Sequence, residues 1–171
     1  MKYIEKLLIG HLTHFKYNKY WKMREYVVDP KKKNKIKKML YLYKIKKSDA
    51  FNLCSFGTNI NFGASFETPP ILPHGPKGII VNEKCKVGIN CVIFHQVTIG
   101  NKDGKSPIIG DNVVIYPGAK VIGDVKIGNN VVIGPNSVVI SDVADGSIVV
   151  GIPGRVIKVQ EYQKYKYVNN Y

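Results

Sequence analysis

Long apolar segments are absent from this sequence. It contains no run of 18 apolar residues, and charged residues such as Lys2 and Lys6 interrupt the N-terminal stretch that a secretory signal peptide would keep apolar. Cysteine is also scarce, because only Cys54, Cys85 and Cys91 occur among 171 residues and they form no CxxC pair. These features predict a cytoplasmic protein whose thiols are reduced and buried in the core.

Acidic residues are few as well. The chain has 12 Asp and Glu against 26 Lys and Arg, which gives a net charge of +14. Residues 1–50 alone hold 15 basic and four acidic residues, so that +11 of the charge belongs to this segment and +3 to the rest. Apolar residues at helical spacing predict two helices over 3–26 and 31–47, with Pro30 at the start of the second.

A basic helical segment rich in tyrosine has several interpretations. It can hold the protein at the anionic inner face of a membrane, bind nucleic acid, or pack on the rest of the chain with its charge exposed to solvent. No base-reading motif accompanies the charge, so we expect no nucleic-acid partner. The first and third interpretations remain open.

The sequence does contain a six-residue repeat. Its marked positions are Val81, Val87, Ile93, Ile99, Ile109, Ile115, Val121, Ile127, Ile133 and Val139. Several of these residues are followed directly by glycine, as in the hexapeptide unit of a parallel β-helix, in which three short strands and their turns form each coil. The longer step from Ile99 to Ile109 predicts a loop of about four extra residues within 101–107.

Two histidines occupy equivalent positions in this repeat. If three residues are inserted around 76–79, the marked positions of an earlier coil are Ile60, Phe66 and Leu72. His74 and His95 then each follow the third inward position of their coil by two residues, so their imidazoles should lie about one coil, or roughly 5 Å, apart. Imidazole suits acid–base catalysis at neutral pH. Because no carboxylate or cysteine shares their phase, we expect no metal site.

Four strings of the sequence resemble the serine acetyltransferase-like branch of the hexapeptide-repeat acyltransferases: residues 72–81 (LPHGPKGIIV), 93–100 (IFHQVTIG), 118–123 (GAKVIG) and 149–157 (VVGIPGRVI). The resemblance covers about residues 58–158. It implies a left-handed β-helix, a homotrimer with active sites between neighbouring chains, and acetyl-coenzyme A as the acetyl donor. It also implies that His74 is the general base that removes the proton of the acceptor hydroxyl. Because His95 shares the phase of His74 one coil later, we expect His95 to support this chemistry rather than perform it.

The chain departs from the serine acetyltransferases in three ways. Asn59 stands fifteen residues before His74, where those enzymes carry an aspartate that orients the imidazole. The loop within 101–107 lacks their second histidine, and the N-terminal segment is strongly basic. On this ground we expect the acceptor to be a small-molecule or lipid-linked sugar of surface-polysaccharide synthesis. The alternatives are a serine O-acetyltransferase of cysteine biosynthesis and a non-catalytic β-helix scaffold or binding module.

Small and basic residues of the repeat are candidates for binding coenzyme A. Small side chains allow its pantetheine arm to approach, basic ones attract its phosphates, and backbone amides near Gly100 or Gly118 are expected to face the oxyanion. The candidates are Gly100, Lys105, Gly118, Ala119, Lys120, Ser137 and Arg155. The expected domains are a basic helical segment over 1–52, a mainly β acyltransferase domain over 53–158 and a polar tail over 159–171.

Overall fold

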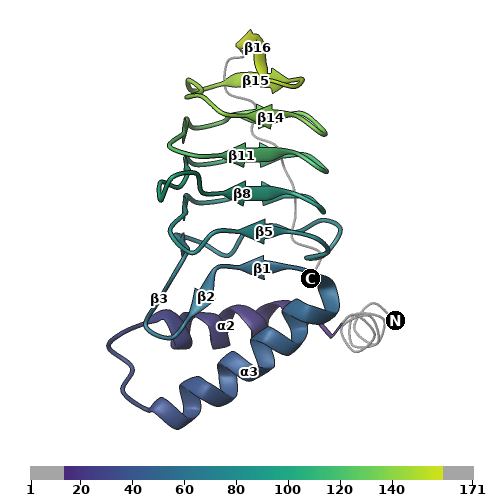
Figure 1. Cartoon of the computed structure of the whole chain (residues 1–171). Helices are drawn as coiled ribbons and strands as arrows, with labels where there is room; N and C mark the ends of the chain where they lie inside the picture. The colour runs from purple at the N-terminus through teal and green to yellow at the C-terminus, as the bar shows by residue number, and fades with distance from the viewer. Residues whose placement is uncertain (1–13, 160–171) are drawn as a thin grey trace.

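Two helices lie across one end of a stack of short parallel strands (Figure 1). The computed structural model describes residues 14–159, and the statements below concern these residues. Most of the first predicted helix before residue 14 and the predicted tail after residue 159 lie outside the described residues. The predicted domain boundaries at 52 and 158 fall beside the ends of a helix and of the last strand, and they stay predictions.

The helices are α2 (Tyr17–Val28) and α3 (Lys35–Asn52). The prediction that the second helix begins at Pro30 is wrong. It begins after Asn34, whose side-chain oxygen accepts a hydrogen bond from the backbone N–H of Lys37 at 2.9 Å and so satisfies a free donor of the first turn. Neither described helix is long and apolar enough to cross a membrane.

The strands build a parallel solenoid, as the six-residue repeat predicted. Its strands in chain order are β1 (Ser55–Phe56), β4 (Ser65–Phe66), β5 (Ile80–Val81), β6 (Lys86–Val87), β7 (Val92–Ile93), β8 (Thr98–Gly100), β9 (Ile108–Ile109), β10 (Val114–Ile115), β11 (Lys120–Ile122), β12 (Lys126–Ile127), β13 (Val132–Ile133), β14 (Val138–Val139) and β15 (Ser147–Val150). A last strand, β16 (Arg155–Val159), pairs antiparallel with β15.

Three parallel sheets form the walls of this solenoid. Sheet 1 has the order β1-β5-β8-β11-β14, sheet 2 the order β4-β6-β9-β12, and sheet 3 the order β7-β10-β13-β15 followed by β16. The chain passes from sheet 1 to sheet 2 to sheet 3 in each coil, so every marked residue faces the marked residue of the coil above. Val81, Ile99, Val121 and Val139, for example, lie in one column.

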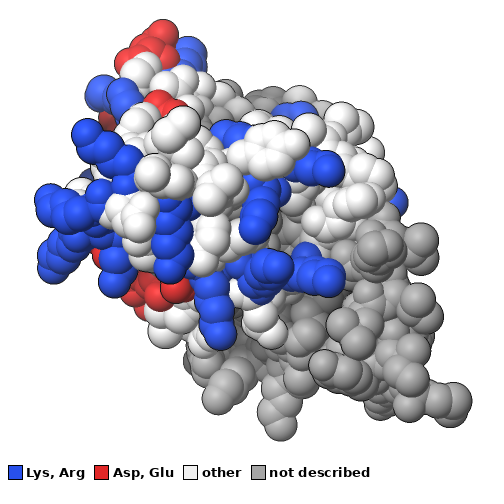
Figure 2. Space-filling view, turned by 90° about the horizontal axis from the view of Figure 1, so that it is seen from below, with Lys and Arg blue, Asp and Glu red and all other residues white. Residues whose placement is uncertain are grey.

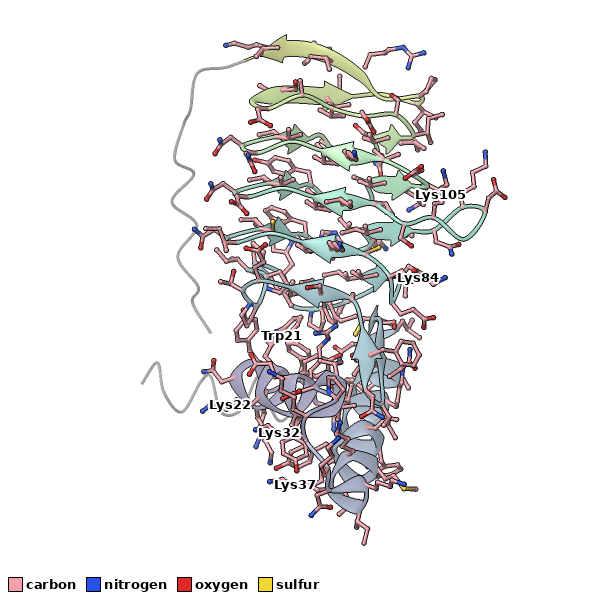
Figure 3. The ribbon with its side chains drawn as sticks, turned by 90° about the vertical axis from the view of Figure 1, so that its left-hand side faces the viewer. Trp21, Lys22, Lys32, Lys37, Lys84 and Lys105 are labelled. Carbon is pink, nitrogen blue, oxygen red and sulfur yellow. The ribbon has the colours of Figure 1, made fainter. Side chains whose placement is uncertain are left out.

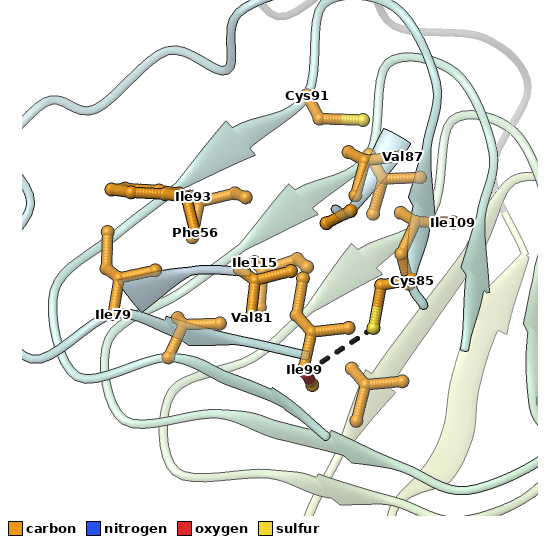
Figure 4. Packing of buried hydrophobic residues seen from close by; sticks show 14 of the residues in the cluster. Phe56, Ile79, Val81, Cys85, Val87, Cys91, Ile93, Ile99, Ile109 and Ile115 are labelled. Carbon is orange, nitrogen blue, oxygen red and sulfur yellow. Dashed lines mark hydrogen bonds between the residues drawn. The ribbon is translucent and has the colours of Figure 1, made fainter. Parts of the chain in front are cut away.

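The marked aliphatic residues fill the interior (Figure 4). All ten are at most 3% exposed, and Cys85 and Cys91, each 1% exposed, lie among them as free thiols. The prediction of reduced, buried cysteines is therefore confirmed for this pair, and Cys54 is buried and free as well. Because each coil covers the apolar side chains of the next, the stack buries a continuous core that no single coil could provide.

The first coil differs from its prediction at one position. Phe66 and Leu72 face the interior as predicted, but Phe56, not Ile60, pairs in register with Val81. The cause is a hairpin of β2 (Thr58–Asn59) and β3 (Phe62–Gly63), which leaves the wall between β1 and β4. The step from Phe56 to Phe66 is ten residues instead of six, so the hairpin adds residues that the six-residue period did not predict.

A buried arginine attaches α2 to this first coil. Arg24 is 3% exposed, and its Nη2 donates hydrogen bonds to the carbonyl oxygens of Phe56 and Ala64, at 2.9 and 2.5 Å. Its guanidinium also lies over the rings of Trp21 and Phe66, with centroid distances of 5.4 and 4.8 Å. Burial lowers the Arg24 pKa to about 10, which leaves it charged at neutral pH. The helices are thus fixed to the solenoid by polar as well as apolar contacts.

Candidate active site

The solenoid has three corners, and two of them carry six of the ten candidate residues. The turns that lead from sheet 3 to sheet 1 form what we call the histidine corner, residues 73–79, 94–97, 116–119 and 134–137. The turns from sheet 1 to sheet 2 form the loop corner, residues 82–85, 101–107, 123–125 and 140–142. Residues that share a corner lie above one another, whereas the two corners are separated by the width of sheet 1.

His74 and His95 are brought together at the histidine corner. Their Nδ1 atoms lie 2.9 Å apart and their ring centroids 5.0 Å apart, which agrees with the spacing of about one coil that the repeat predicted. His74 is exposed and His95 is half-buried. The inserted turn that carries His74 stacks on the next coil because the backbone N–H of Gln96 donates to the carbonyl oxygen of Lys77 at 2.9 Å.

The contact between the two Nδ1 atoms restricts the protonation states of the pair. A hydrogen bond between them requires one Nδ1 to carry a proton and the other to be bare. If His74 donates, its Nε2 is unprotonated and can accept a proton from a substrate. His95 is then the acceptor, and the hydrogen bond persists after His74 becomes an imidazolium ion. The geometry therefore allows His74 to act as a base whose tautomer is held by His95.

Aromatic side chains that the sequence reasoning missed flank this pair. Phe94 meets the His74 ring edge-on, with centroids 5.1 Å apart at 81°, and stacks on Tyr116 at 5.1 Å and 13°. Both point away from the core, and they pack with Val92, Val114 and neighbouring apolar residues on the outer face of sheet 3. The sequence did contain a signal for them, because Phe94 and Tyr116 are large aromatic residues at positions where the repeat places an outward side chain.

Asn59 does not lie beside His74 within one chain. It belongs to the β2–β3 hairpin, and its Nδ2 donates a hydrogen bond of 2.7 Å to Oε2 of Glu83, a residue of the loop corner. The expectation of Asn59 in a catalytic role with His74 is therefore not met inside a single chain. Sequence spacing placed the two residues in one coil, but they lie on different corners of it.

Three of the coenzyme candidates lie on the histidine corner, near His95. Gly118 donates its backbone N–H to the carbonyl oxygen of His95 at 3.1 Å, so this one amide is not free to face an oxyanion. Ala119 and Ser137 are fully buried, and the Ser137 Oγ accepts a hydrogen bond from Gly151. Because their side chains are buried, these two residues offer no polar contact at the surface of the solenoid.

Lys120 is the candidate cation closest to this corner. It is the first residue of β11 in sheet 1, its side chain is exposed, and its Nζ donates to the carbonyl oxygen of Gly118 at 3.2 Å. Arg155 is exposed at the start of β16, where its Nη1 donates to the carbonyl oxygen of Gly154 at 3.1 Å. Both charges are thus available to an anionic ligand lying along the outside of the solenoid.

The other candidates lie elsewhere. Gly100 ends β8 at the opposite edge of sheet 1, and a Cβ there would meet Ile122 Cδ1 at 2.9 Å, so close packing explains its small side chain. Lys105 projects from the loop corner (Figure 3) and forms an ion pair of 2.7 Å with Asp124. Its hydrogen bond to Asp124 raises the pKa of Lys105. The predicted loop within 101–107 is present.

No described cysteine has the character of a nucleophile. Burial raises the pKa of the Cys85 thiol to about 11 and that of the Cys91 thiol to about 12, and it also raises the pKa of Cys54. A thiol with such a pKa is almost never a thiolate at neutral pH. In the part of the chain that the structure describes, no three His, Cys, Asp or Glu side chains are grouped as metal ligands. The histidine pair is thus the candidate acid–base group of this surface.

Residues 106–141 match the family model of the bacterial transferase hexapeptide (six repeats). The matched residues run from the end of the loop within 101–107 to the turn after β14, so the match lies within the solenoid. A serine acetyltransferase of Staphylococcus aureus is 43% identical over 106 residues, which cover 60% of this chain and 49% of that protein. This chain therefore spans about half the length of the curated relatives that it matches.

Solved structures point to the same transferases. The serine acetyltransferase of Neisseria gonorrhoeae aligns with a TM-score of 0.62 at 29% identity, over 73% of this chain and 48% of that one. A serine acetyltransferase in complex with CoA aligns with a TM-score of 0.63 at 26% identity, over 81% and 54% of the two chains. The expectation of a sugar acceptor in polysaccharide synthesis is wrong, because these relatives are serine acetyltransferases.

Proposed function

We propose that this chain is an O-acetyltransferase that moves an acetyl group from acetyl-coenzyme A to the hydroxyl of serine. The observation that carries the proposal is the His74–His95 pair, an exposed acid–base group on a hexapeptide-repeat solenoid. The relatives and structural neighbours named above supply the donor and the acceptor. The free, buried cysteines fit a reducing compartment, and we propose a cytoplasmic location.

In the proposed reaction His74 is the general base. Its Nε2 accepts the proton of the serine hydroxyl while that oxygen attacks the thioester carbonyl carbon. The C–S bond breaks, and the thiolate of coenzyme A takes the proton back from the imidazolium ion. His95 is a positioning residue, because its Nδ1 accepts the hydrogen bond that keeps the His74 Nε2 unprotonated before the reaction. No acyl-enzyme forms, since no described cysteine is a thiolate.

Coenzyme A would lie along the outside of the histidine corner. Lys120 and Arg155 supply exposed charges for its phosphates. Ala119 and Ser137 leave the wall without protruding side chains there, because both point inward and are fully buried. This placement puts the thioester end of the donor next to the histidine pair, since Lys120 follows the turn that carries Gly118, the hydrogen-bond partner of His95.

We propose further that the active protein is a homotrimer with sites between neighbouring chains. The support is the separation of the two corners. His74 and His95 lie on one corner, while Lys105 and Glu83, the hydrogen-bond partner of Asn59, lie on the other, so one chain cannot direct both sets at one substrate. A neighbour whose loop corner faces the histidine corner would bring a carboxylate and a cation to the base.

Acetyl transfer to free serine tests the proposal. Thioester consumption from acetyl-coenzyme A should depend on serine, and His74→Asn should lower turnover by about 10²- to 10⁴-fold with little change in coenzyme A affinity. His95→Asn keeps an acceptor near the position of Nδ1 and should retain more activity than His95→Ala. Wild-type turnover by His74→Asn, or no serine-dependent turnover by the native trimer, would refute the proposal.

A further inference from the structure

The face of α3 that points away from the solenoid carries large apolar side chains. Lys38, Ile45 and Asp49 lie on the inner face of this helix and are buried. The outward apolar residues, with their exposed fractions, are Ile36 (74%), Met39 (63%), Leu40 (56%), Tyr43 (67%) and Phe51 (56%). At 100° per residue these five side chains fall on one side of the helix, opposite the buried face. Ile36, Met39, Leu40 and Tyr43 form a contiguous stripe there, and the exposed Lys47 lies between this stripe and Phe51. Isolated exposed apolar residues are ordinary, but a contiguous stripe on one helix marks a contact surface.

Lysines border this stripe on both sides. Lys37 and Lys44 follow one edge and Lys35 and Lys46 the other, at the same helical spacing, and all four are exposed. The only acidic residue of α3 is Asp49, which is buried on the inner face. Figure 2 shows Lys and Arg gathered around uncharged side chains at this end of the molecule. The first turns of the outer face of α3 are therefore apolar in the middle and positive at both edges, Lys47 adds a positive charge further along its centre, and the face has no acidic residue.

The loop before α3 extends the positive charge. A cavity of about 490 Å³ lies at the N-terminus of this helix, beside Met39, and Lys32, Lys33, Lys35 and Lys38 are among its lining residues. Lys38 is 1% exposed, and its Nζ donates only to neutral oxygens, the carbonyl of Asp29 and the side-chain amide of Asn61. No acidic residue stands in the first turn of α3 to balance these charges.

We propose that the outer face of α3 docks on an anionic lipid bilayer. An apolar stripe with lysines at both edges fits the boundary between headgroups and acyl chains, where the stripe leaves water and the lysines meet lipid phosphates. Each lysine near such a surface contributes about 1 kcal/mol, a factor of about five in affinity. The helix lies in the plane of the membrane, and the solenoid with its histidine corner remains in the aqueous phase.

Sedimentation of the full-length protein with vesicles tests this proposal. Vesicles of phosphatidylcholine mixed with phosphatidylserine should bind it at low salt, and vesicles of phosphatidylcholine alone should not. The K37E/K44E variant should bind more weakly by a factor of about 30 or more. Loss of two attractive charges accounts for that factor, and their reversal weakens binding further. Its matched control is K86E/K126E, which changes two exposed lysines on the outside of sheet 2.

The apolar stripe has its own matched pair. Leu40→Ser should weaken binding about tenfold, because a side chain that enters the bilayer boundary is lost, whereas Ile108→Ser, at an isoleucine that is 42% exposed on sheet 2, should not. All four variants should keep serine-dependent acetyl transfer in solution if the proposed function holds. No binding to anionic vesicles, or equal binding by α3 variants and controls, would refute the docking surface. So would a lower mass of lipid-free Leu40→Ser in light scattering, which would show that a second copy of the chain covers the stripe.

Discussion

Replacing Asp49 with asparagine should stabilise the fold above neutral pH and have little effect in mild acid. Asp49 lies on the inner face of α3 at 4% exposure. The Tyr20 hydroxyl donates to its Oδ1 at 2.7 Å, but no described residue donates to its Oδ2. Burial raises the pKa of this carboxyl to about 6, although the hydrogen bond from Tyr20 and the charges of Lys46 and Arg24 act in the opposite direction. Its ionised form is therefore poorly solvated in the folded state.

The sign and the size of this effect on stability follow from the linkage between proton binding and folding. The pKa of Asp49 rises on folding from 3.8 to about 6, so between these two pH values the folded state binds more protons than the unfolded state. The contribution of Asp49 to the free energy of unfolding is fully present below about pH 4 and is lost as the pH rises through about 6. At about 1.4 kcal/mol for each pH unit of difference, the loss is about 3 kcal/mol. Asparagine carries no charge and avoids it, while its amide oxygen can still accept from Tyr20.

Urea unfolding followed by circular dichroism at fixed protein concentration measures this effect. We expect the stability difference between Asp49→Asn and the wild type to grow by about 3 kcal/mol from about pH 4 to about pH 8. Asp103→Asn, in the exposed loop within 101–107, is the matched control and should show no such growth. A difference that stays constant with pH, or that shrinks as the pH rises, would show that Asp49 is not destabilised by burial.

Three further predictions concern the solenoid and its attachment. Gly118→Ala should lower the melting temperature, because Gly118 has a φ of +73° and a Cβ there would lie 2.1 Å from Asn136 Oδ1; an unchanged melting temperature would contradict this. Arg24→Met should cost about 2–4 kcal/mol in urea unfolding, since two buried carbonyl oxygens lose their donor. Cys85 and Cys91 should resist iodoacetamide in the native protein at mildly alkaline pH and react once it is unfolded.

The regular part of the fold could be predicted because every coil repeats one geometry. An inward residue such as Val87 fixes the orientation of the residue six places later, in the next sheet. Paired residues such as Val87 and Ile109 form one column across the coils, so an error of one residue in the phase would turn the whole column outward. The loop within 101–107 was predictable for the same reason, since it adds residues without changing that phase. The spacing of His74 and His95 followed from the same counting.

The irregular part could not be predicted from the period. The hairpin of β2 and β3 is held by contacts distant in sequence: a Cβ on Gly57, just before it, would meet backbone atoms of Glu83 at 2.6 Å. The start of α3 also depended on a local choice, because Asn34 offers a cap and Pro30 does not. In both places specific side-chain chemistry, rather than hydrophobic spacing, decides where the chain turns.

The candidate site also has a part that the repeat could predict and a part that it could not. A repeat converts sequence distance into height along the solenoid, so it could place His95 directly above His74. It says nothing about what faces a corner from outside, and the acceptor must reach the base from there. Asn59 illustrates the point, because it shares a coil with His74 and yet bonds to Glu83 on another corner. In the proposed trimer, substrate selection would therefore depend on which corner of a neighbouring chain meets the histidines. For this reason the repeat predicted the histidine pair, while the proposed acceptor had to come from relatives.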